Sequence, residues 1–209
     1  MSEAWYHRFM AQHERNATRR KWPGWRLAGY ALVALIIITP IRLFVAQPFY
    51  VSGDSMEPDF APADYLIIDE LSYRIHAPAR GDVIVFRYPL DPDKVFIKRI
   101  VGLPGETVQI AGGKITIAGE NLVGIMTLDD PFAATTSTPA MSTTLHSDEY
   151  YVMGDNRLAS SDSRVWGPVA RRFIIGRAFV RLFPILRFSI MPGKNSLARE
   201  DIHTIFTSQ

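Results

Sequence analysis

Residues 95–117 read VFIKRIVGLPGETVQIAGGKITI, and this stretch contains three short runs rich in β-branched residues. Two turn-forming sequences separate the runs, Leu103-Pro104-Gly105 and Ala111-Gly112-Gly113. The Gly112-Gly113 pair joins two alternating runs, which favours a β-hairpin. Similar runs occur elsewhere in the chain, at residues 65–68, 83–86, 149–153 and 176–183. Strands at this spacing predict a mostly β domain, built as a folded antiparallel sheet or a small barrel.

The composition is that of a folded protein. The chain has 209 residues, of which 47% are hydrophobic and 21% charged, with a formal net charge of +2. A disordered chain would have fewer apolar residues and a larger net charge. The absence of cysteine excludes a disulfide scaffold, a thiolate zinc site and a cysteine nucleophile. The length allows one domain of ordinary size with an appendage.

A basic N-terminal segment precedes a long apolar one. Residues 1–26 carry six basic and two acidic side chains. Residues 27–41 contain no charged side chain, and the apolar segment extends over residues 25–46 if Arg42 reaches the head groups at its end. As a helix this segment would be about 33 Å long, enough for a bilayer core of about 30 Å. The pattern predicts a transmembrane anchor.

Two other interpretations of residues 25–46 remain open. A buried core helix is one, although a cluster of basic residues directly upstream would be unusual there. A cleaved signal peptide is the other, but cutting after Ala46 would put Phe44 where a small residue is expected. For an uncleaved, single-pass anchor, the positive-inside rule keeps the basic tail, residues 1–24, in the cytoplasm. The β domain, residues 47–191, and a C-terminal tail, residues 192–209, would then lie on the outer face of a bacterial inner membrane.

A serine lies in a turn directly after this apolar segment, in the sequence VSGDSMEP, residues 51–58. Gly53 permits an unusual backbone angle, and Pro58 restricts the chain soon after. Such a turn can present the hydroxyl and the backbone N–H of Ser55 toward one point. An ordinary loop at the membrane exit is the alternative, because Gly-Asp-Ser is common turn chemistry.

The run at residues 95–101 carries one cation on each face. On a strand, Phe96, Lys98 and Ile100 share one face, and Arg99 lies on the other. A lysine that extends its ammonium to solvent at a sheet edge is one interpretation. A lysine held in a dry site is the other, and burial would then lower its pKa.

A third stretch, GDNRLASSDSR at residues 154–164, is dense in hydrogen-bonding side chains. It follows the probable strand at residues 150–153. A calcium loop is an alternative, but the ligand spacing and the closing glutamate of such loops are missing. An ordinary loop remains a further alternative.

Taken together and in this order, the three stretches resemble type I signal peptidases, which cut signal peptides from exported proteins. The patterns are Gly-x-Ser-Met-x-Pro, Lys-Arg-x-Val-Gly-x-Pro-Gly and Gly-Asp-Asn-Arg followed by Ser-x-Asp-Ser-Arg, supported by residues 64–67 and 80–86. The resemblance runs from about Phe44 to Arg187. It implies a mostly antiparallel β domain with an apolar surface resting on the membrane. It also implies signal-peptide-bearing preproteins and a lipid bilayer as partners, with no cofactor, metal or nucleic acid.

The resemblance assigns roles to individual residues. Ser55 would be the nucleophile, and Lys98 the general base of a Ser/Lys dyad. Ser160 would hydrogen-bond the lysine, and Asp162 and Arg164 would brace the site. The remaining assignments concern the substrate: the backbone N–H of Ser55 would hold the oxyanion, and the groove candidates are Met56 and Phe96.

Two features depart from the pattern of the family. Gly53 stands where some members have a serine whose hydroxyl helps to hold the oxyanion, so Ser55 N–H would need another donor or a water. Leu158 and Ala159 stand where many members have Asp and Asn, so those two polar side chains have no counterpart here.

A lysine base also agrees with the placement of the histidines, which lie in the predicted cytoplasmic tail or in motif-poor segments: His7, His13, His76, His146 and His203. Four rival functions remain. A basic tail that binds nucleic acid is one, but anchor topology explains the same charges without a partner. A processing peptidase of conjugative transfer would use the same chemistry. A self-cleaving repressor would need a DNA-binding unit, for which residues 1–26 are too short. A membrane-anchored β-domain binding module would use the serine and lysine only structurally.

Overall fold

The computed structural model describes residues 24–44, 46–119, 124–128, 132 and 139–193. The expected basic tail therefore lies outside the described residues except for Gly24, and so does the C-terminal tail beyond Gly193. The chain divides into two compact units, residues 1–41 and 42–209.

Helix α2 spans Gly24–Phe44 and covers most of the apolar segment predicted at residues 25–46. Large apolar side chains along it are exposed, including Trp25, Tyr30, Leu32, Val33, Leu35 and Ile36. Among the residues that the structure describes, no helix meets the combined length and hydropathy needed to cross a membrane.

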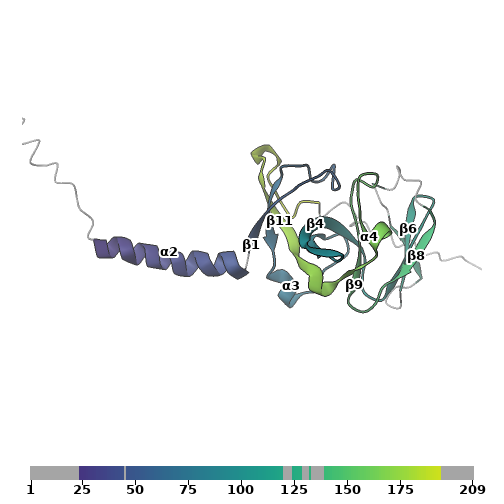
Figure 1. Ribbon diagram of the computed structural model, residues 1–209, viewed down its shortest axis with the longest axis horizontal. Helices are drawn as coiled ribbons and strands as arrows, with labels where there is room; N and C mark the ends of the chain where they lie inside the picture. Colours follow the sequence, from purple (N-terminus) through teal and green to yellow (C-terminus); the bar gives the residue numbers. More distant parts are fainter. Residues whose placement is uncertain (1–23, 45, 120–123, 129–131, 133–138, 194–209) are drawn as a thin grey trace, which may run out of the picture. The chain divides into compact units, whose positions relative to one another are not determined.

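The second unit is built mainly from antiparallel strands, as the sequence predicts (Figure 1). The strand order of the first sheet is β1-β2-β11-β3-β4-β9-β10, and β12 pairs with β11. Their bounds are β1 Ala46–Tyr50, β2 Tyr65–Asp69, β3 Val83–Tyr88, β4 Asp91–Gly102, β9 Glu149–Met153, β10 Val169–Ala170, β11 Ile174–Phe183 and β12 Ser189–Ile190. This ladder of described strands begins at β1 and ends at β10 without closing, so the domain has an open folded sheet instead of the barrel considered from the sequence.

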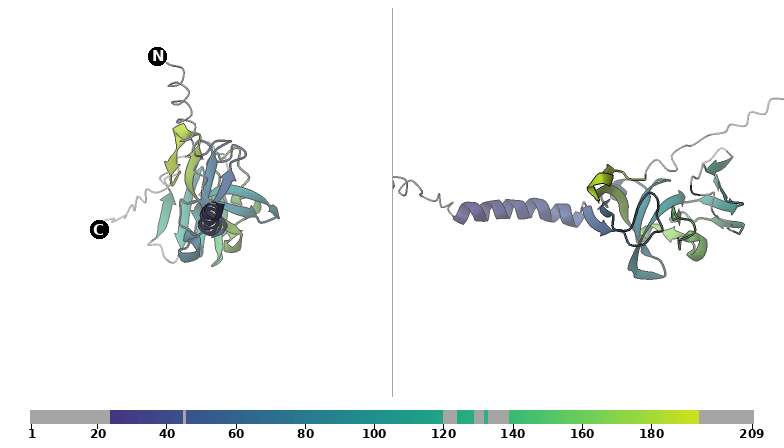
Figure 2. Two further views of the ribbon diagram at one scale, coloured as in Figure 1. Left: turned by 90° about the vertical axis from the view of Figure 1, so that its left-hand side faces the viewer. Right: turned by 90° about the horizontal axis from the view of Figure 1, so that it is seen from above.

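A second, four-stranded sheet has the order β7-β6-β5-β8 and lies beyond β9, away from β1 and β11 (Figure 2). Its strands are β5 Glu106–Ala111, β6 Lys114–Gly119, β7 Ile125–Leu128 and β8 Met141–Thr144. The hairpin predicted at Gly112-Gly113 joins β5 and β6, with Ala111 opposite Lys114. Both glycines have positive φ, 56° and 76°, as a tight two-residue hairpin turn requires.

Short helical turns connect the strands: α3 Ser72–Ile75, α4 Ser163–Trp166, η2 Arg171–Phe173 and η3 Ile185–Arg187. The second sheet packs Ile110, Ile115 and Ile117 into a core that it shares with β4 and β9 of the first sheet.

Apolar side chains cover both faces of the first sheet at β3 and β4. From β3, Val83 and Val85 pack on one face, whereas Ile84 and Phe86 pack on the other. Because successive strand residues point to opposite faces, β3 reads as an unbroken apolar run. The neighbouring strand β4 pairs with β3 so that Lys98 lies opposite Ile84. Lys98 therefore lies among apolar side chains on the face that it shares with Ile84.

The small second sheet offers a test of this packing, because β6 and β7 each carry an isoleucine in a different environment. Ile117 is 0% exposed and Ile125 is 72% exposed. Ile117→Ala leaves a cavity and should lower the free energy of unfolding by about 2–5 kcal/mol. Ile125→Ala removes the same atoms from a solvent-facing position and should change it by less than about 0.5 kcal/mol. Urea denaturation of both variants measures the difference; equal losses would contradict the placement of the core.

Candidate functional site

Ser55 lies in a loop between β1 and β2 that closes on itself. The backbone N–H of Val51 donates to the carbonyl of Asp64, and the N–H of Ala63 donates back to Val51. Within the loop, Gly53 has a φ of 88°, a conformation that favours glycine. The closed ends and this turn present Ser55 in a partly exposed position.

Strand β4 brings Lys98 to this loop. Lys98 Nζ lies 2.6 Å from Ser55 Oγ. It also donates to the backbone carbonyl of Ile97 at 2.9 Å, and it lies 5.6 Å from the centre of the Phe96 ring. The lysine side chain is on the face predicted from the strand alternation, and the residue is only 4% exposed. The structure thus brings together the two residues that the sequence marks as a Ser/Lys pair.

Burial lowers the pKa of Lys98 to about 8, against the opposing influence of the carboxylates of Asp162 and Asp155. A lysine with an ordinary pKa is neutral in roughly one molecule in 2,500 at pH 7, whereas a pKa of about 8 leaves about a tenth of the molecules neutral. A neutral amine within hydrogen-bond distance of a hydroxyl can accept its proton. The arrangement therefore has the geometry and the acidity of a nucleophile beside a general base.

The third motif packs directly against the Ser55 loop. The backbone N–H of Asn156 donates to the carbonyl of Ser55 at 3.0 Å. A Cβ at Gly154 would overlap both this carbonyl and the Ser160 hydroxyl, so only glycine fits at this position. The role of Gly154 was not expected from the sequence, where the residue reads as ordinary loop glycine.

Asp162 and Arg164, to which the resemblance gives a bracing role, form an ion pair with each other. The Arg164 guanidinium donates to the carboxylate of Asp162 at 2.8 Å and 2.9 Å. The backbone N–H of Gly154 donates to the same carboxylate at 3.0 Å. Burial raises the pKa of Asp162, but the hydrogen bonds from Arg164 and Gly154 outweigh it, and the pKa is below its ordinary value. The carboxylate therefore stays ionised and ties the third motif together.

Ser160 departs from its expected role. Its hydroxyl is buried without a well-formed hydrogen bond, and the bonds that Lys98 Nζ makes go to Ser55 and to the backbone of Ile97. The Ser160 hydroxyl instead helps to lower the pKa of the carboxyl group of Asp162. The predicted Ser160–Lys98 hydrogen bond is therefore absent from this structure. Ser160 packs directly against Gly154, where a Cβ would overlap its hydroxyl.

The two groove candidates differ in their environments. Met56 is fully buried and packs in the same core cluster as Phe60 and Leu66, so its side chain presents no surface to a substrate. The expectation that Met56 lines a groove is wrong for this structure, because the side chain next to the serine anchors the loop in the core. Phe96 is only half-buried and lies beside Lys98, a position compatible with its prediction.

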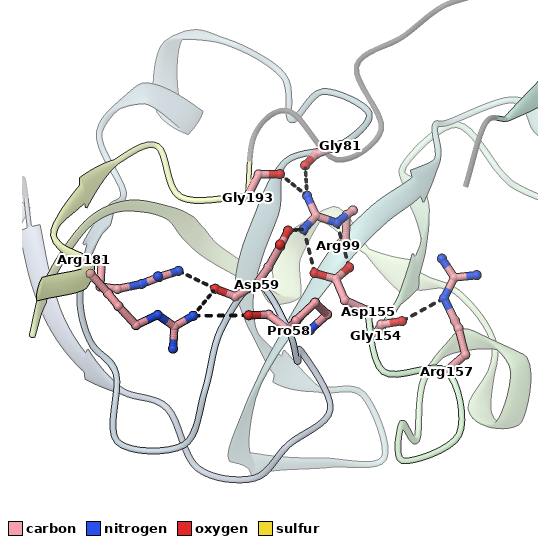
Figure 3. A network of polar contacts seen from close by, with 10 residues as sticks. Pro58, Asp59, Gly81, Arg99, Gly154, Asp155, Arg157, Arg181 and Gly193 are labelled. Carbon is pink, nitrogen blue, oxygen red and sulfur yellow. Dashed lines mark hydrogen bonds and ion pairs between the residues drawn. The ribbon is translucent and has the colours of Figure 1, made fainter. Parts of the chain in front are cut away.

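Arg99 is a part of the site whose partners the sequence did not indicate. It is fully buried on the opposite face of β4 from Lys98. Its Nε and Nη2 atoms donate to the carboxylate of Asp155 at 2.8 Å and 2.6 Å, and Nη2 also pairs with Asp59 at 2.8 Å. Nη1 donates to the carbonyls of Gly81 and Gly193 (Figure 3). One signal in the sequence could have indicated these partners, namely a cation among apolar residues of a strand. A buried arginine requires carboxylates nearby.

Comparison with known proteins places the chain in a family. Residues 25–183 match the family model described as signal peptidase, peptidase S26. The chain is 39% identical over 177 residues to a probable signal peptidase I-2 of Synechocystis sp., covering 80% of this chain and 77% of the relative. It is 39% identical over 165 residues to a signal peptidase I of Leptolyngbya laminosa, covering 74% and 77%.

A crystal structure of a signal peptidase I from Enterococcus faecalis aligns with 49% of this chain and 97% of that chain, at 29% identity and a TM-score of 0.42. The family model alone covers well over half of the sequence, and it includes all three motifs. The chain belongs to the signal peptidase family, peptidase S26.

Proposed function

We propose that this protein is a serine endopeptidase that removes signal peptides from exported preproteins, with Ser55 as nucleophile and Lys98 as general base. The observation that carries the assignment of the two residues is the 2.6 Å distance between Ser55 Oγ and a buried Lys98 Nζ. Membership of the signal peptidase family and the names of the relatives, signal peptidase I, support the choice of substrate.

The reaction would proceed by acyl transfer. Ser55 Oγ attacks the carbonyl carbon of the scissile peptide bond while its proton passes to the neutral Lys98 Nζ. The tetrahedral intermediate then collapses, the C–N bond breaks, and Lys98 gives the proton to the leaving amine. Water, deprotonated by the same lysine, hydrolyses the acyl-enzyme and releases Ser55.

The oxyanion of the intermediate needs donors that are fixed in place before the reaction. The backbone N–H of Ser55 is one candidate. Because Gly53 has no hydroxyl, the second donor would be another backbone N–H or a water. The preprotein would bind in an extended conformation along a strand edge, where main-chain hydrogen bonds give affinity and small pockets select small side chains near the cut.

We also propose that residues 25–46 attach the catalytic domain to the bacterial inner membrane, with the N-terminus in the cytoplasm. The support is the uncharged stretch at residues 27–41, the basic cluster before it and the exposed apolar side chains of α2. The positive-inside rule gives the orientation.

Membranes from cells producing the full chain should retain it through an alkaline carbonate wash that releases a soluble marker protein. Release of the chain with the marker would contradict the attachment.

The dyad is tested by cleavage of a purified preprotein in detergent. Ser55→Ala removes the nucleophile, and Lys98→Ala removes the base, so each variant should lose cleavage by a factor of about 1,000 or more. Lys98→Arg should be equally inactive, because arginine remains protonated and cannot act as a base. Ser52→Ala is the matched control, since this exposed serine lies three residues away in the same loop. Cleavage by Ser55→Ala, or its loss in Ser52→Ala, would contradict the assignment, and a protein that only binds preproteins would leave them intact.

The pKa of Lys98 predicts the pH dependence of the reaction. The neutral amine is the active form, so kcat/KM should rise with pH, with a midpoint at about pH 8 set by the lysine. Well below that midpoint the neutral fraction, and hence kcat/KM, should fall about tenfold per pH unit. Initial rates between about pH 5.5 and pH 10, with folding followed by circular dichroism, provide the measurement. A flat profile in this range would show that the base is a different group.

A further inference from the structure

Asp59 lies four residues after Ser55 in the same loop and belongs to none of the three motifs. Its carboxylate and its backbone carbonyl are both engaged by arginines from other parts of the fold. The carboxylate pairs with Arg99 at 2.8 Å. The carbonyl accepts from Arg181 at 2.5 Å and from Arg187 at 3.2 Å. Figure 3 shows Asp59 between Arg99 and Arg181.

On one side, Arg99 links Asp59 to the rest of the site. The guanidinium bridges two carboxylates, those of Asp59 and Asp155. Arg99 follows Lys98 directly on β4, and Asp155 precedes Asn156, whose N–H holds the carbonyl of Ser55. One bridge therefore joins the loop of the nucleophile, the strand of the base and the third motif. The side chains of Arg99 and Asp155 are each 1% exposed, whereas that of Asp59 is 25% exposed, so solvent screens the Asp59 end of the bridge more than the Asp155 end.

On the other side, arginines of β11 and η3 hold the backbone of the loop. Arg181 pairs with Asp64, at the closed end of the loop, at 3.1 Å. Its guanidinium also lies over the ring of Phe60, 5.0 Å from the ring centre. Arg187 reaches the carbonyl of Pro58 at 3.2 Å in addition to that of Asp59. Planar guanidinium groups with several donors suit such multiple contacts.

Besides these arginine contacts, the loop is attached to the first sheet by the apolar packing of Met56 and Phe60 and to the third motif by the hydrogen bond from Asn156. Gly53, Asp54, Glu57 and Pro58 are exposed, whereas Met56 and Phe60 are buried in the core. The two core residues fix the depth of the loop through apolar packing, which has no directional preference. The carboxylate of Asp59 adds a directed, charge-assisted contact to the strand that carries the base.

We propose that Asp59 is a positioning residue, which holds Ser55 Oγ at proton-transfer distance from Lys98 Nζ by locking the loop to Arg99. This inference rests on the proposed function of the Ser/Lys pair. Asp59 contacts neither atom of that pair and acts through the loop and through β4. A displacement of about 1 Å between reacting groups can reduce the rate about 100-fold.

The test is Asp59→Asn in the full chain, with preprotein cleavage measured in detergent beside the wild-type protein. Asparagine keeps the size of the side chain but removes its charge, and Arg99 keeps Asp155 as a partner. We expect kcat to fall about tenfold or more while KM stays within about twofold, because substrate contacts are unchanged. The loss should persist at pH values above the Lys98 midpoint, since it arises from distance and not from protonation.

Asp69→Asn is the matched control. Asp69 of β2 also forms a partly buried ion pair, with Arg177 of β11 at 3.1 Å, but it lies outside the Ser55 loop. The Asp69→Asn variant should lose about as much thermal stability as Asp59→Asn but keep kcat within about twofold of the wild-type value. If Asp59→Asn does not fold, Asp59→Glu replaces it under the same criteria, since the longer side chain keeps the charge but changes the distance between the loop and Arg99, now bridged at 2.8 Å.

The outcomes separate the two proposals. Absence of cleavage by the wild-type protein would overturn the proposed function, and the positioning role with it. Cleavage by the wild-type protein with a decrease in kcat smaller than about tenfold in Asp59→Asn would overturn the positioning role alone. An equal decrease in the Asp69→Asn control, or a rise in KM that accounts for the loss, would overturn it as well.

Discussion

Two adjacent cations on β4, Lys98 and Arg99, are buried on opposite faces of one sheet, and much of the surrounding structure follows from how each is accommodated. An arginine cannot lose its proton in a protein, so its burial requires carboxylates and carbonyls around it. Asp155, Asp59 and two backbone carbonyls meet this need for Arg99. A lysine can instead respond to burial by a lower pKa. The strand therefore carries one side chain, Arg99, that stays charged and is paired with carboxylates, and another, Lys98, whose lowered pKa lets it act as a base.

This division explains why the site is assembled from distant parts of the chain. The partners of Arg99 come from the loop after β1 and from the loop after β9. The ion pairs of Arg99 hold both loops against β4. The loop after β1 carries Ser55, and the loop after β9 carries the third motif. The second sheet takes no direct part in these contacts. Gly102, at the end of β4, packs tightly against side chains of Val108, Leu145 and Tyr151, where the chain passes from the first sheet to the second.

Local patterns predicted the strands, the β5–β6 hairpin and the faces of β4, because alternation and turn chemistry act over a few residues. They also predicted that Ser55 and Lys98 belong to one site, through the resemblance of three motifs to a family. The partners of buried polar groups were harder to predict. Asp59 and Asp155 lie 40 and 56 residues from Arg99, and although Asp155 belongs to the third motif, nothing in the local sequence of either residue indicates Arg99 as its partner.

The errors in the predicted site have a common physical origin. Motif order places Met56 next to the nucleophile and Ser160 near the base, but it does not say where their side chains point. Met56 packs into the core, and Ser160 packs tightly against Gly154. Whether the sheet stays open or closes into a barrel could not be predicted either. The answer depends on the pairing of strands far apart in the chain, such as β2 with β11.

The buried amine of Lys98 also affects the folded state as a whole. In the unfolded chain this lysine would have its ordinary pKa of 10.5, whereas in the folded protein the pKa is about 8. Protons therefore bind the unfolded state more tightly, and at neutral pH the folded state is less stable by about 3 kcal/mol than it would be with an unshifted lysine. That difference is a large fraction of the stability of a typical domain. Other interactions in the fold must offset this loss. The low pKa that makes the amine reactive therefore also lowers the free energy of unfolding of the protein.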